Sequence, residues 1–70
     1  MQALAIAITD NSAIVGYIGN GQNHTTKHIE ARRFYRVRDA ATAMQIAREN
    51  HPAWNVDAKY GMEIVNAHPV

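Results

Sequence analysis

The stretch from Phe34 to Pro52 constrains the fold most, because apolar residues recur there with the spacing of one helix face. This apolar stripe, at positions i, i+3, i+4 and i+7, consists of Ala40, Ala43, Met44 and Ala47. The short carboxylate of Asp39 suits an N-cap, and its charge suits the positive end of a helix. Asn50 can take a left-handed conformation after the last turn, and Pro52 prevents continuation. One helix of about three turns is therefore expected, capped by Asp39.

Before this helix, the sequence predicts a pair of strands. Residues 3–9 alternate between larger and smaller apolar side chains, so the larger ones should face the core. Residues 10–12 supply turn chemistry, and the apolar run over residues 13–18 should pair back on the first strand. Gly16 marks a weak point in that run or a close approach of another part of the chain. Residues 19–21 read Gly-Asn-Gly, which suits a type I′ hairpin turn.

The polar residues 22–27 are expected to form either a mobile loop or the first, solvent-facing part of a third strand. Residues 28–38 are predicted to form that strand, because apolar and polar positions alternate again. The odd positions are mostly apolar and should face the core. Arg33 is the exception among them and indicates a bulge. The even positions should project together from the solvent face of the sheet. The arginines and the aromatic ring among them are Arg32, Phe34, Arg36 and Arg38.

After the helix, residues 59–66 alternate once more and predict a last strand, with Tyr60, Met62 and Ile64 facing inward. Trp54 should pack over one end of the core, and residues 68–70 should form a frayed tail. The element order is then β-β-β-α-β in a single domain over residues 1–70. The sequence therefore predicts an α+β fold: an antiparallel sheet of three or four strands, one helix on one face, and an open opposite face.

The composition limits the class of protein. A chain of 70 residues without cysteine has a small core and no disulfide or thiolate metal site to reinforce it. Dimerisation would add buried apolar area, so a homodimer is expected, formed by edge-strand pairing or by packing of exposed sheet faces. No segment approaches the roughly 20 apolar residues that span a bilayer, and no signal-peptide core is present. We expect a soluble protein of the cytoplasm, although the lack of cysteine is equally compatible with export.

The net charge of +1 hides an uneven distribution: residues 27–38 hold five Lys or Arg against one acid, Glu30. Arginines that alternate with an aromatic ring on an open sheet face could bind nucleic acid, with guanidinium groups on phosphates and the ring on a base. The same residues could dock an acidic protein surface, where Arg and aromatic side chains are common hot spots. They could also be an ordinary solvated strand face that discourages edge pairing. The predicted contact set is Arg32, Phe34, Arg36 and Arg38.

Catalytic and metal chemistry have little support in the sequence. Ser12 has no neighbouring histidine, and no paired carboxylates fall at a spacing that fixes their geometry. His24 and His28 are four residues apart, but two threonines between them and the preceding Gly-Asn-Gly argue against a shared helix face. We therefore expect no enzyme, no cofactor and no metal site.

The pattern Tyr35-x-Val37-x-Asp39-Ala-Ala-x-Ala-Met-x-x-Ala47, followed by a short loop and an alternating strand, resembles small phage-encoded accessory proteins. Some small anti-CRISPR proteins have a similar size and order of strands around one helix. This resemblance implies a non-enzymatic inhibitor in the host cytoplasm that binds a host nucleoprotein complex. It carries no site residue over position by position, because that group shares no site motif. The alternative is a small nucleic-acid-binding module that uses the same Arg/Phe residues.

Overall fold

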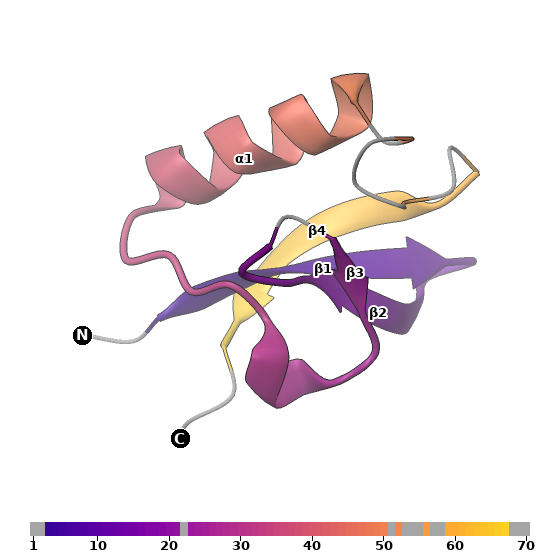
Figure 1. Cartoon of the computed structure of the whole chain (residues 1–70), viewed down its shortest axis with the longest axis horizontal. Coiled ribbons are helices and arrows are strands. Elements are labelled where there is room, and N and C mark those ends of the chain that lie inside the picture. Colours follow the sequence, from indigo (N-terminus) through magenta and orange to yellow (C-terminus); the bar gives the residue numbers. More distant parts are fainter. Residues whose placement is uncertain (1–2, 22, 51, 53–55, 57–58, 68–70) are drawn as a thin grey trace.

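The computed structural model describes residues 3–21, 23–50, 52, 56 and 59–67. Four antiparallel strands form a sheet in the order β3-β2-β1-β4, and one α-helix packs across one face of it (Figure 1). The predicted α+β class, with one helix on an antiparallel sheet, is confirmed. In chain order the elements are β1 (Leu4–Asp10), β2 (Ala13–Ile18), β3 (His24–Thr25), the short 3-10 helix η1 (His28–Glu30), α1 (Val37–Glu49) and β4 (Gly61–Asn66).

The first hairpin forms where it was predicted. Asn11 and Ser12 join β1 to β2 with φ angles of 51° and 71°, the left-handed conformation that a tight hairpin turn needs. The type I′ prediction for Gly19-Asn20-Gly21 is wrong, because within the described residues no glycine has positive φ. The connection there is wider, and the Gly19 N–H donates to the Asn23 carbonyl at 2.8 Å.

Gly16 is a close-approach site, as one of the two sequence interpretations held. The imidazole of His24 lies over it, and a Cβ atom at this position would overlap that ring. His24 pairs with Ile18, two residues further along β2. Glycine here therefore lets the short strand β3 pack its histidine against β2.

The predicted third strand over residues 28–38 is wrong. The strand that adds to β2 is His24–Thr25, within the residues 22–27 that were one of the two options for its start, and the chain then turns through η1. Residues 31–36, which we call the crossing segment, then run from the end of β2, where Ala31 pairs with Gly19, to the start of β1, where Phe34 pairs with Leu4. The Arg32 N–H donates to the Ile18 carbonyl at 2.8 Å, and Leu4 and Phe34 exchange two backbone bonds at 2.7 and 2.8 Å. The crossing segment thus bonds to β2 at one end and to β1 at the other, and carries the chain to α1 (Figure 1).

This route reverses the predicted faces. Phe34, expected on the solvent side, is only 6% exposed and lies in the core beneath α1. Tyr35 and Val37, expected in the core, are 59% and 64% exposed. Ala31 and Phe34, three residues apart, still face opposite sides of the sheet, but Phe34 lies on the side that α1 covers and Ala31 on the other. No strand forms over Arg33, so the bulge inferred there is wrong as well.

The helix begins two residues before Asp39, so the predicted N-cap is also wrong. Arg36 is the N-cap, with an extended φ of −132° and no side-chain cap bond, and Asp39 lies in the first turn. Asn50 follows the last turn with φ −124° rather than a left-handed conformation, and its N–H and Nδ2 both donate to the Ile46 carbonyl, at 2.9 and 3.2 Å.

Three members of the predicted stripe, Ala40, Ala43 and Ala47, are buried as expected.

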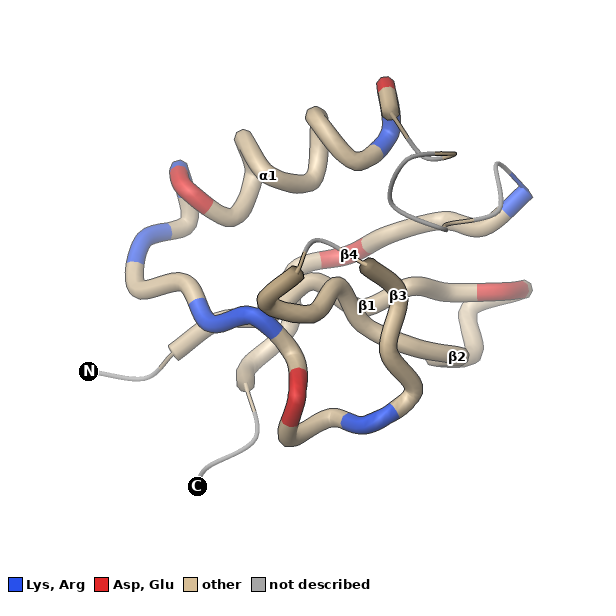
Figure 2. Tube along the Cα trace, viewed as in Figure 1, with Lys and Arg blue, Asp and Glu red and all other residues tan. Residues whose placement is uncertain are grey.

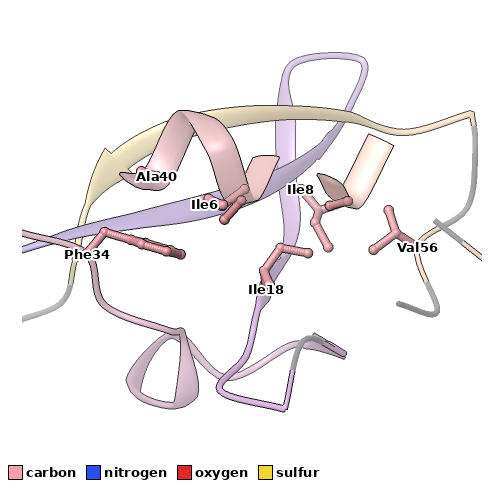
Figure 3. Close-up of a cluster of buried hydrophobic side chains, with 8 residues drawn as sticks. Ile6, Ile8, Ile18, Phe34, Ala40 and Val56 are labelled. Atoms are coloured by element: carbon pink, nitrogen blue, oxygen red, sulfur yellow. The ribbon is translucent and has the colours of Figure 1, made fainter. Parts of the chain in front are cut away.

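Two clusters of buried hydrophobic side chains stabilise the fold, one on each face of the sheet. The main core lies between the sheet and α1, where Ile6, Ile8 and Ile18 are fully buried (Figure 3). Met62 and Ile64 of β4 pack against it, as predicted. On the opposite face, which was expected to be open, a smaller cluster of Ala5, Ala31 and Ala67 is buried, and the ring of His28 stacks on Tyr17 at 4.4 Å. That face is therefore partly covered. The predictions for Trp54 and for residues 68–70 lie outside the described residues.

Replacing Ile6 by alanine tests the main core. The Ile6 side chain is fully buried, so Ile6→Ala should lower the free energy of unfolding by about 2–5 kcal/mol, measured by urea denaturation with circular dichroism. Ile14, in the exposed part of β2, is 47% exposed and provides the matched control. Ile14→Ala should change stability by about 0.5 kcal/mol. Equal losses in the two variants would contradict this core.

Candidate binding groove

An open groove of about 520 Å³ lies between the crossing segment and α1. We call it the basic groove. The crossing segment and α1 line it with Arg32, Arg33, Phe34, Tyr35, Arg36, Asp39, Thr42, Ala43 and Ile46. It exists because the crossing segment enters the sheet at Phe34 and then turns outward to start α1, which leaves a hollow beside the first three turns of the helix.

The groove combines positive charge with apolar surface. Three arginines lie along it and Asp39 is its one acid, and Figure 2 shows this concentration of Lys and Arg between η1 and the start of α1. Tyr35 and Ile46, at 59% and 43% exposed, are large apolar side chains that the fold leaves in contact with solvent. A ligand with both negative charge and apolar groups would match this surface.

Phe34 mainly stabilises the core and exposes little of its ring in the groove. Its ring is buried in the main core, and the guanidinium carbon of Arg32 lies 5.0 Å from the ring centroid. At this distance a cation–π contact holds the arginine over the ring. Phe34 therefore positions Arg32 at the groove and is not free to stack on a ligand.

The start of α1 adds to the positive character of the groove. Arg36 at the N-cap and Arg38 in the first turn place cations at the end of the helix that already carries partial positive charge. Both side chains are exposed, and the carboxylate of Asp39 in the same turn offsets part of the repulsion. Two arginines at a helix N-terminus destabilise the helix, because their charges repel its positive end. Proteins often carry such locally unfavourable residues at functional sites.

The structure brings together three of the four predicted contact residues. Arg32, Phe34 and Arg36 line the basic groove, whereas Arg38 does not. Arg38 lies in the first turn of α1, and its carbonyl accepts a bond from the Thr42 hydroxyl at 2.9 Å. The predicted common face of one strand is wrong, because these residues come from the crossing segment and the helix.

Sequence reasoning missed Arg33 and Tyr35, because the assumed strand alternation turned both toward the core. It also missed the α1 wall of the groove. Asp39, Thr42 and Ile46 recur at i, i+3 and i+7, so they share one side of the helix. One feature of the sequence could have indicated this wall: Ile46 is a large apolar residue that lies beside the stripe of alanines and methionine.

His24 and His28 lie on opposite faces of the sheet. His24 pairs with Ile18 on the face that carries α1, whereas His28 stacks on Tyr17 on the opposite face. Two imidazoles on opposite faces of a sheet cannot share one ion. Across residues 3–21, 23–50, 52, 56 and 59–67, no three His, Cys, Asp or Glu side chains gather as metal ligands would.

Comparison with protein-family models, with curated proteins and with solved structures finds no match to this chain. The site is therefore interpreted from its own geometry. Within the described part of the chain, α1 is too short and too polar to cross a bilayer, and no other helix could do so.

Substitutions at two neighbouring aromatic positions distinguish core from surface. Phe34→Ala should lower the free energy of unfolding by about 3–5 kcal/mol, because it empties a buried site and removes the ring beneath Arg32. Tyr35→Ala should change it by only about 0.5 kcal/mol, because that ring is mostly in solvent. Thermal or urea denaturation measures both. If the larger loss came from Tyr35, the assigned faces of the crossing segment would be wrong.

Proposed function

We propose that this chain is a non-enzymatic interaction protein that binds an acidic segment of a protein partner in the basic groove. The supporting observation is the three arginines beside a hollow in which Tyr35 and Ile46 remain exposed. Carboxylates of the partner pair with the guanidinium groups, and an apolar side chain of the partner fills the hollow between the crossing segment and α1. Tyrosine and arginine at the centre of such a contact are the residue types that dominate binding energy in protein interfaces.

A protein partner is favoured over nucleic acid by the position of Phe34. Binding of single strands relies on aromatic rings that are free to stack on successive bases. Phe34 was the ring expected to do so, and it is buried. Burying the exposed side chain of Ile46 would also stabilise a complex with an apolar side chain, whereas it would contribute nothing to the binding of a phosphate.

One observation supports the alternative function, binding of single-stranded nucleic acid. Tyr35 is a ring that remains exposed between Arg33 and Arg36, and arginines beside a stacking ring suit a short single strand. This alternative is separable from the first by its strong dependence on salt.

Action in the cytoplasm belongs to the same proposal, since a chain without cysteine needs no oxidising compartment to fold. Inhibition of a host nucleoprotein complex, as in phage-encoded anti-CRISPR proteins, stays a prediction from the sequence pattern. Because protein surfaces that contact nucleic acid are themselves basic, the basic groove would dock on an acidic surface of such a complex outside its nucleic-acid channel.

Peptide selection on the folded domain tests the proposed groove. From a random peptide library, the domain should enrich peptides that carry Asp or Glu beside an aliphatic or aromatic residue. Arg36→Glu should weaken the enriched peptides at least about tenfold by calorimetry, because it sets like charges against each other in the contact. The matched control is Lys27→Glu, the same charge change at an exposed residue that does not line the groove, and it should bind as the wild type does.

Two outcomes would contradict this function. Peptides without acidic residues, or peptides that bind Arg36→Glu as well as the wild type, would show that the groove is not the contact. Salt-sensitive binding of a single-stranded oligonucleotide, lost in Arg36→Glu and seen without peptide enrichment, would assign the groove to nucleic acid instead.

A further inference from the structure

Strand β4 forms the long edge of the sheet. Among the described residues it pairs with β1 on one side and with no strand on the other. The opposite edge, β3, is only two residues long, which limits pairing there. β4 runs for six residues, Gly61–Asn66, with no proline or lysine and one charge, Glu63. It therefore lacks the devices with which monomeric proteins usually protect a sheet edge.

The direction of the free backbone groups along β4 follows from its pairing with β1. The Ala67 N–H donates to the Ala3 carbonyl at 2.9 Å, and Leu4 directs its own N–H and carbonyl to Phe34, on the side away from β4. In an antiparallel pair, bonded and non-bonded positions alternate. The odd-numbered residues of β4 therefore bond to β1. Met62, Ile64 and Asn66 direct their N–H and carbonyl groups out from the free edge.

These outward groups match a second copy of the same strand. A two-fold axis through Ile64, perpendicular to the sheet, lets Ile64 exchange backbone bonds with Ile64 of the partner subunit. Met62 then pairs with Asn66 of the partner subunit, and Glu63 stands opposite Val65 of the partner subunit. No like charges meet in this register. Moving the axis to Glu63 would set two carboxylates directly opposite each other, which is unfavourable.

Helix α1 offers a second surface on the same side. It packs on both β1 and β4, so it lies over the edge half of the sheet. The side of α1 away from the basic groove carries Val37, Ala41, Met44 and Arg48, at i, i+4, i+7 and i+11. Val37 is 64% exposed, and Ala41 is a small exposed residue near the middle of this stripe.

The sheet geometry brings the two helices to packing distance. With strands about 4.8 Å apart, a helix midway between β1 and β4 lies about 5 Å from the two-fold axis, and its symmetry mate lies about 10 Å away. Packed helices lie about 8–10 Å apart. Small Ala41 allows this approach, and an antiparallel mate would bring Met44 of the partner subunit beside it.

We propose that this chain forms a homodimer through the free edge of β4, with the two α1 helices side by side on one continuous sheet. The register, the spacing and the helix stripe fit a second copy, whereas an unrelated peptide on this edge would leave Val37 and Ala41 uncovered. Each basic groove lies on the far side of its helix, so both grooves stay accessible.

The small interface makes this dimer dependent on concentration. Six residues of β4 and four of α1 contribute from each subunit, and at roughly 30 Å² per residue they bury roughly 600 Å² in total. Stable specific interfaces bury about 1,200–2,000 Å². The dimer should therefore be weak and should dissociate on dilution.

Sedimentation velocity from about 5 µM to about 1 mM tests the proposal. The wild-type mass should rise from one chain, 7.8 kDa, towards two chains. Ala41→Glu sets two carboxylates close to the two-fold axis and should raise the dimer Kd at least tenfold. Thr42→Glu makes the same change of side-chain charge at an exposed position on the groove side of α1, away from the stripe, so it should dimerise as the wild type does.

A second pair of variants tests the strand edge separately from the helix. Asn66→Pro removes an N–H that points away from β1, so the monomer fold should survive by circular dichroism while the dimer Kd rises at least tenfold. Asn66→Ala keeps that N–H and should dimerise normally. A single-chain mass over the whole range would overturn the proposal. So would a dimer that either Ala41→Glu or Asn66→Pro leaves unchanged.

Discussion

The two backbone bonds between Leu4 and Phe34 are the contact on which the other features depend. They hold the crossing segment against β1, while the bond from Arg32 to Ile18 holds it against β2. Fixed at both ends, the segment sends the Phe34 ring beneath α1 and the Ala31 methyl group to the opposite face. Without these bonds, the core beneath α1 would lose its only buried aromatic ring among the described residues.

The same contact determines where the arginines of the basic groove lie. Because Phe34 enters the core, the flanking arginines are carried to the rim of the hollow beside α1, and Tyr35 is left in solvent. A regular strand would have spread these arginines along one flat sheet face. The crossing geometry gathers them around an apolar floor instead, which suits a shaped partner better than a uniform polyanion. The free edge of β4 lies on the other side of α1, so partner binding and self-association use separate surfaces.

Local patterns predicted the fold class, the first hairpin, the buried stripe of α1 and the inward residues of β4. Each depends on contacts within one element or between neighbours in sequence. The predictions that were wrong share a different cause, since they depend on contacts between parts of the chain that are far apart in the sequence. Alternation over residues 28–38 looks like a strand, but its pairing depends on contacts with Gly19 and Leu4, which lie far away in the sequence, beyond the end of the β1–β2 pairing. Asp39 likewise has the chemistry of an N-cap, yet the bonds at Phe34 let the helix begin at Val37. The groove could not be predicted for the same reason, since its two walls meet only through this crossing.

Amide hydrogen exchange at Leu4, Arg32 and Phe34, followed by NMR, tests the crossing most directly. Each of these N–H groups donates to a backbone carbonyl across the junction of β1, β2 and the crossing segment. If the junction is as described, all three should exchange slowly, at rates comparable to amides in the middle of α1, because only sub-global opening would expose them. Exchange at Arg32 and Phe34 as fast as in an unstructured peptide would show that the segment is an ordinary surface loop, and would contradict the account.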